Sequence, residues 1–111
     1  MAMREEAKLI ESKAIYEFDS FRVDATNRLL LRDGEVVPLT AKVFDLLLVF
    51  VENHGRLLEK DEVMQRVWQQ SFVEEGNLTR NVSTLRKALG EDSKSHQYIV
   101  TVPGYGYKFV A

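Results

Sequence analysis

The sequence contains no cysteine and no long hydrophobic run. Without cysteine the chain has no disulfide staples, thiolate chemistry or cysteine-based zinc sites, which is compatible with a reducing cytoplasm. No apolar stretch approaches the about 18 residues that a membrane-spanning helix needs. No secretory signal segment is evident, because the first apolar pair, Leu9 and Ile10, lies among charged residues. We therefore expect a soluble cytoplasmic chain that makes no membrane contact itself.

The signatures of enzymes are also absent. The two histidines, His54 and His96, have no Asp, Glu or Cys partner at a useful spacing, and no nucleophile elbow, Walker loop or His-Glu-x-x-His motif occurs. Gly104 and Gly106 are interpreted as turn residues, because no strand-to-helix context makes them a phosphate cradle. We expect no catalysis, no metal, no cofactor and no small-molecule substrate.

The length and composition predict one α+β domain. A chain of 111 residues with 45% hydrophobic content can bury a modest core. Residues 1–14 form a short polar segment that we predict to be a flexible or helical N-terminal extension, and residues 15–111 form the domain. Four β-type runs broken by turn residues predict a four-stranded antiparallel sheet, at 16–18, 21–24, 28–32 and 35–39. Asp33-Gly34 predicts a hairpin between the last two runs.

Three helices and a hairpin are predicted to follow. Thr40 is the expected cap of a central helix of about 13 residues, which ends at residues 53–55. A second helix is expected over about 60–69, after Glu59, a poor capping residue. A third is expected over about 77–89, between Asn77 as cap and Gly90 as terminator. Residues 98–110 are predicted to form a hairpin with its turn at 103–106.

The third helix has the most informative charge pattern. Residues 76–89 carry three basic residues and no acid, although the whole chain has a net charge of -2 and a pI near 5.7. Residues 1–76 hold 10 basic and 15 acidic residues, whereas residues 77–111 hold 5 basic and 2 acidic residues. An apolar stripe at helical spacing, formed by Leu78, Val82, Leu85 and Leu89, leaves the basic side chains on the opposite face. The pattern predicts a helix that contacts an anionic partner, with nucleic acid as the first candidate.

The order of elements is that of a winged helix, in which the third helix enters the DNA major groove and the hairpin flanks it. The segments 37–47, 67–68, 85–90 and 98–109 resemble the OmpR/PhoB-type winged-helix output domain of bacterial transcription regulators. The amino-acid sequence of residues 72–86 is most similar to that of the CadC/ToxR-like one-component branch of that family. The resemblance covers about residues 15–111 and implies sequence-specific binding of double-stranded DNA.

Two residues of the third helix are candidates for contact with base edges. Arg80 and Thr84 point away from the apolar stripe, and an arginine can donate two hydrogen bonds to guanine O6 and N7. Many members of the resembled family carry a base-reading arginine at the position of Thr84. Further side chains are expected on the DNA backbone: Asn77, Asn81, Ser83, Arg86 and Lys87 from the helix, and Thr101, Tyr105 and Lys108 from the hairpin.

Two features depart from simple DNA contact. Pro103 stands where the response-regulator branch has an arginine that enters the minor groove, so the helix is expected to carry more of the specificity. The family also implies that the connection between the second and third helices contacts RNA polymerase, through Gln70, Phe72, Val73 and Glu74. Trp68 is interpreted as a core residue beside it.

Alternative functions remain open from sequence alone. The negative net charge suits a winged helix that binds a protein instead of DNA, and RNA binding is a third interpretation. Relatives of this type bind tandem DNA repeats as dimers. Relatives in the response-regulator branch also carry a receiver domain, and those in the CadC/ToxR-like branch carry a further region that often spans the membrane. We therefore expect the sequence to be one module of a longer protein, which would be membrane-tethered if it belongs to the second branch.

Overall fold

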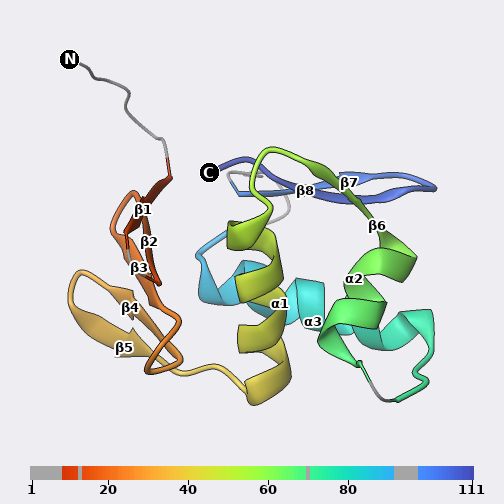
Figure 1. Cartoon of the computed structure of the whole chain (residues 1–111), viewed down its shortest axis with the longest axis horizontal. Helices are drawn as coiled ribbons and strands as arrows, with labels where there is room; N and C mark the ends of the chain where they lie inside the picture. Colours follow the sequence, from red (N-terminus) through yellow and green to blue (C-terminus); the bar gives the residue numbers. More distant parts are fainter. Residues whose placement is uncertain (1–8, 13, 70, 92–97) are drawn as a thin grey trace.

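The computed structural model describes residues 9–12, 14–69, 71–91 and 98–111. Two antiparallel sheets flank three helices, one beside α1 and the other across one end of the helices (Figure 1). The first sheet has the strand order β1-β2-β3-β4-β5, and the second has the order β6-β8-β7. The elements in chain order are β1 Ile10–Ser12, β2 Ile15–Phe18, β3 Phe21–Asp24, β4 Leu29–Arg32, β5 Glu35–Val37, α1 Ala41–Glu52, β6 Leu57–Glu59, α2 Lys60–Val67, α3 Glu75–Ala88, β7 Ile99–Val102 and β8 Gly106–Phe109.

The expected α+β winged-helix fold is confirmed. Strands β2 to β5 follow the predicted meander, and Asp33 and Gly34 have φ values of 52° and 83°, the positive values that a tight hairpin turn requires. A fifth strand was not predicted: β1 pairs with β2 and comes from residues assigned to the N-terminal extension. Its three residues give too short a pattern to indicate a strand. Residues 1–8 of that extension lie outside the described residues.

Helix α1 begins and ends as the sequence indicates. Val43 N donates to Thr40 Oγ1 at 3.2 Å, which makes Thr40 the cap, and the helix stops before Asn53. Seven of its residues are buried: Val43, Phe44, Leu46, Leu47, Val49, Phe50 and Val51. The helix contacts the other two helices and β8, and the five-stranded sheet lies beside it (Figure 1). A helix buried on so many sides is the centre of the core.

Two helix boundaries differ from the prediction. Helix α3 begins at Glu75, two residues early, with Glu74 at the capping position, so Asn77 lies inside the helix and does not cap it. Neither Glu74 nor Glu59, before α2, makes a side-chain capping bond. Helix α2 ends at Val67, and Trp68 occupies its C-terminal capping position. The missing capping bond at Glu74 explains why sequence signals placed the start of α3 poorly, whereas the start of α2 at Lys60 agrees with the prediction.

The C-terminal hairpin belongs to a three-stranded sheet, because β6 pairs with β8. The turn is tighter than expected, with Tyr105 N donating to Val102 O at 3.0 Å. Gly106 is therefore a strand residue instead of a turn residue. A Cβ atom at Gly106 would lie 1.9 Å from the backbone oxygen of Leu58, so only glycine allows β6 to approach β8 this closely.

The two sheets meet through aromatic side chains. The ring of Phe18 in β2 lies 5.3 Å from the rings of both Tyr98 and Phe109. The Tyr98 hydroxyl donates to Asp19 Oδ2 at 2.6 Å. Burial, with this hydrogen bond, raises the pKa of Tyr98, so the hydroxyl stays protonated and keeps donating through the neutral range.

Replacement of Gly106 by alanine tests the approach of β6 to β8. We expect Gly106→Ala to lower the free energy of unfolding by at least about 2 kcal/mol, because the clash is with backbone and must separate the strands. Urea unfolding measures the change. Gly76→Ala is the matched control, since no atom lies within 4 Å of its added Cβ, and it should be neutral or stabilising in α3. Equal stability of the two variants would contradict the assignment.

Candidate nucleic-acid interface

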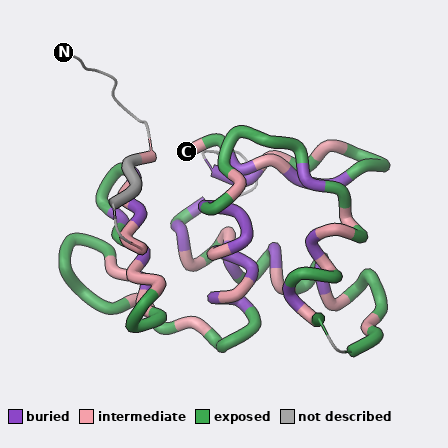
Figure 2. The backbone as a smooth tube through the Cα atoms, in the orientation of Figure 1, coloured by how far each residue is buried: buried purple, intermediate pink, exposed green. Residues whose placement is uncertain are grey.

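Helix α3 is attached to the domain by one apolar stripe. Leu78, Val82, Leu85 and Leu89 are at most 2% exposed, and the helix packs against α1 and α2. The opposite side of the helix is open to solvent (Figure 2). The predicted amphipathic helix is thus confirmed.

The outer face of α3 presents four exposed polar side chains: Arg80, Ser83, Thr84 and Lys87. Arg80 Nη1 makes one long hydrogen bond of 3.4 Å to Asn77 Oδ1, so most of the five guanidinium N–H groups remain available to a partner. The Thr84 hydroxyl donates to the backbone oxygen of Arg80 at 3.1 Å. The two base-contact candidates therefore lie on one exposed face, one helical turn apart.

The two asparagines are occupied within the helix. Asn77 and Asn81 are half-buried, and Asn81 Nδ2 donates to the backbone oxygen of Asn77 at 2.7 Å. Asn77 Oδ1 accepts from Arg80. Asn77 therefore orients Arg80, in addition to any contact of its own with the DNA backbone.

Arg86 joins the helix to the hairpin. Its Nη2 atom donates to the backbone oxygen of Ile99 and to Thr101 Oγ1, both at 2.8 Å. Its Nε lies 3.9 Å from Glu91 Oε1, and the side chain is 23% exposed. Among the described residues, the buried Nε makes no hydrogen bond, so the two bonds from Nη2 hold the guanidinium group against β7. Sequence reasoning expected the phosphate contact and missed the link to β7.

Glu91 is a second residue that sequence reasoning missed. Its side chain is fully buried, and Oε2 accepts from the backbone N–H groups of Tyr98 and Ile99 at 3.2 Å and 3.1 Å. A glutamate just after Gly90 reads as an exposed loop residue. Its role becomes visible only when β7 is brought beside the end of α3.

The hairpin presents the three residues that the sequence indicated. Thr101 is exposed, Lys108 is half-buried, and Tyr105 at the tip is 63% exposed. Tyr105 shares a shallow cavity with Glu59, Lys60 and Asp61. The tip therefore lies beside two carboxylates and one ammonium group, and Pro103 adds no charge.

An ion pair connects the beginnings of α2 and α3. Lys60 Nζ lies 2.9 Å from Glu75 Oε2, and the hydrogen bond to Glu75 raises the pKa of Lys60. The carboxylate of Glu75 also interacts favourably with the positive, N-terminal end of the α3 dipole. The first turn of α3 is thus acidic, which the expected start at Asn77 did not include.

The connection expected to contact polymerase contains one very exposed apolar side chain. Phe72 is 95% exposed, Val73 is half-buried and Glu74 is exposed, whereas Gln70 lies outside the described residues. Trp68 is half-buried and packs against the core. The core interpretation of Trp68 thus agrees with its packing, and Phe72 is the exposed residue of the pair.

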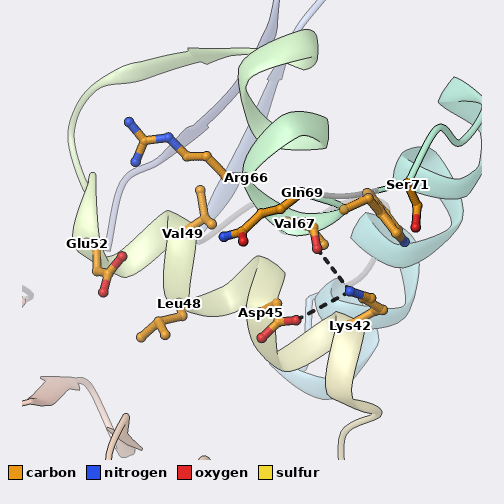
Figure 3. Close-up of a pocket in the computed structure, with 10 residues that line it drawn as sticks. Lys42, Asp45, Leu48, Val49, Glu52, Arg66, Val67, Gln69 and Ser71 are labelled. Atoms are coloured by element: carbon orange, nitrogen blue, oxygen red, sulfur yellow. Dashed lines mark hydrogen bonds and ion pairs between the residues drawn. The ribbon is translucent and has the colours of Figure 1, made fainter.

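A cavity of about 540 Å³ lies between α1 and α2, at the start of this connection (Figure 3). Lys42 Nζ donates to the backbone oxygen of Val67 at 3.1 Å and lies 3.9 Å from Asp45 Oδ2. Side chains of both charges line this cavity, so the chemistry of the cavity does not select one class of ligand.

The described part of the chain holds no group of three or more Asp, Glu or His side chains suited to a metal ion. Within the same residues, every helix is too short or too polar to cross a membrane.

The exposed polar face of α3, followed by the β7–β8 hairpin, places the domain in the class of winged-helix domains.

Comparison with known proteins identifies the family. Residues 34–109 match the family described as "Transcriptional regulatory protein, C terminal". The chain belongs to this family, the OmpR/PhoB-type DNA-binding output domains of transcription regulators.

Several relatives share the domain. The transcriptional activator CadC of Escherichia coli is 39% identical over 80 residues, which are 71% of this chain and 16% of CadC. The transcriptional regulatory protein YvrH of Bacillus subtilis is 31% identical over 106 residues, 95% of this chain and 45% of YvrH. The chain thus spans less than half the length of these relatives.

Solved structures agree in fold. The DNA-binding domain of Escherichia coli CadC superposes with a TM-score of 0.78 at 31% identity, covering 91% of this chain and 95% of that one. The Klebsiella pneumoniae RstA DNA-binding domain, solved in complex with the RstA box, has a TM-score of 0.78 at 25% identity and covers 88% of this chain and 98% of that one.

Replacement of Arg86 tests its link to β7. We expect Arg86→Ala to lower the free energy of unfolding by about 2 kcal/mol, because it removes two hydrogen bonds and the cation next to a buried carboxylate. Thermal unfolding measures the loss. Lys87→Ala, an exposed neighbour, is the control and should change stability by less than about 0.5 kcal/mol. If both variants unfolded like the parent, the link would carry no stability.

Proposed function

We propose that this domain binds a specific sequence of double-stranded DNA as the output module of a bacterial transcription regulator. Helix α3 lies in the major groove, and the β7–β8 hairpin lies on the adjoining backbone or minor groove. The observation that carries the proposal is the exposed face of α3, with Arg80 and Lys87 opposite the buried stripe. Family membership supports it.

The roles of the residues follow from their positions. Arg80 reads a guanine, and Thr84 contacts a neighbouring base. The DNA backbone is contacted by a larger set, in which Arg86 also holds Thr101: Asn77, Asn81, Ser83, Arg86, Lys87, Thr101, Tyr105 and Lys108. The function is binding without catalysis or cofactor.

Further partners belong to the same proposal. Phe72, which is 95% exposed beside Val73 and Glu74, suits a contact with RNA polymerase, and Gln70 completes the expected loop. Two copies are expected to bind tandem DNA repeats. We expect the domain to act in the cytoplasm, whether or not the rest of the protein is tethered to a membrane.

Loss of the Arg80 guanidinium should relax sequence preference. We expect Arg80→Ala to reduce the ratio of affinities for a selected duplex and a random duplex by about 5-fold to 150-fold, the value of one bidentate contact to guanine. Fluorescence anisotropy with both duplexes measures it. Lys87→Ala is the control. It should weaken binding to both duplexes alike and reduce the salt dependence of the affinity. An unchanged ratio in Arg80→Ala would remove its base-reading role.

A protein-binding winged helix is the alternative function, favoured by the net charge of -2. Salt titration against a random duplex separates the two. A DNA-binding domain that neutralises phosphates should lose affinity steeply between about 50 and 200 mM salt, because binding releases counterions. Absence of measurable duplex binding at about 50 mM salt would support the protein-binding alternative.

A further inference from the structure

Thr84 has unusual chemistry for a base-contact position in the middle of a recognition helix. Its side chain is exposed, but its hydroxyl proton is already donated to the backbone oxygen of Arg80 at 3.1 Å. A threonine has one hydroxyl donor, so Thr84 has no proton left for guanine O6 or N7 or for thymine O4. What it offers a base is a methyl group and the acceptor lone pairs of its oxygen.

The methyl group is the feature that distinguishes Thr84 from its neighbours on the outer face of α3. Arg80 and Lys87 supply the long hydrogen-bond donors of this face, and both are cationic. The major groove offers one apolar group that distinguishes a base, the C5-methyl of thymine, and a threonine methyl packs against it. Adenine and cytosine amino groups are the alternative partners, through the hydroxyl oxygen.

We propose that Thr84 is a specificity-determining residue that recognises thymine through contact between its methyl group and the thymine C5-methyl. This inference rests on the proposed function, since it requires α3 to lie in the major groove. Thr84 follows Arg80 by four residues, a rise of about 6 Å along the helix, which corresponds to about two base-pair steps of B-DNA. The binding site should therefore contain a guanine read by Arg80 and a thymine within about two base pairs of it.

The experiment begins with selection of duplexes from a random pool by the 111-residue chain. In the selected duplex, each thymine is replaced in turn by deoxyuridine, which lacks only the C5-methyl. For the parent protein, we expect one replacement to lower affinity by about fourfold, the factor associated with burial of one methyl group. Anisotropy titration at fixed salt concentration measures the affinity of the protein for each duplex.

Two substitutions separate the methyl group from the hydroxyl. Thr84→Ser keeps the hydroxyl and its bond to Arg80 but lacks the methyl, so the uracil penalty should disappear. Thr84→Val keeps the methyl without the hydroxyl, so the penalty should remain about fourfold. Thr79→Ser is the matched control: Thr79 is also exposed on α3 and donates to the backbone oxygen of Glu75 at 3.4 Å, and its replacement should leave the penalty intact.

The outcomes distinguish this inference from the proposed function. Selective binding without any uracil penalty, or a penalty that persists in Thr84→Ser, would overturn the thymine contact while leaving specific DNA binding in place. A thymine preference that Thr84→Val abolishes and Thr84→Ser retains would also overturn it, because the hydroxyl would then be the recognising group. Failure to select any duplex over random DNA would overturn the proposed function itself.

Discussion

The burial of α1 is the constraint on which the rest of the structure depends. Seven of its twelve residues are buried, so most of the helix surface must be covered by other elements, and only the side with Asp45, Leu48 and Glu52 is open to solvent. The five-stranded sheet, α2, α3 and β8 each cover part of it (Figure 1). Because α3 is one of these covers, its apolar stripe is committed to the core, and its polar face must point outward.

A second constraint sets the hairpin relative to α3. Arg86 reaches from the helix to the backbone of Ile99 and the side chain of Thr101, while buried Glu91 accepts from the backbone at the start of β7. Both carry charge in a mostly apolar setting, where such groups require well-placed partners. These hydrogen bonds fix the position of β7 relative to the C-terminal end of α3.

The sequence predicts those parts of the structure that repeat a local pattern. The stripe on α3, the Thr40 cap and the Asp33-Gly34 turn are local signals, and all three occur in the structure. Strands β1 and β6 have three residues each and exist because a neighbouring strand accepts them. No local pattern indicates such pairings, so the fifth strand and the three-stranded sheet were missed.

The same distinction holds for the interface. Exposure of Arg80 and Thr84 follows from helical spacing and could be predicted. The partners of Arg86, the role of Glu91 and the need for glycine at 106 depend on residues at other places in the chain. Sequence position alone cannot show that a carboxylate after a helix end will lie beside the first residues of a distant strand.

The charge distribution relates this architecture to DNA recognition. Most acidic residues precede position 77, and several of them are neutralised locally, as Glu75 is by Lys60 and Glu62 is by Arg56 and Arg66. The exposed part of α3 between Arg80 and Lys87 has no carboxylate. Repulsion from the acidic body weakens with distance over roughly 10 Å at moderate salt, so contacts made by α3 feel mainly their own neighbours. At the hairpin tip, Pro103 adds no charge, and the carboxylates of Glu59 and Asp61 lie beside the ammonium group of Lys60, so the tip has no excess of positive charge.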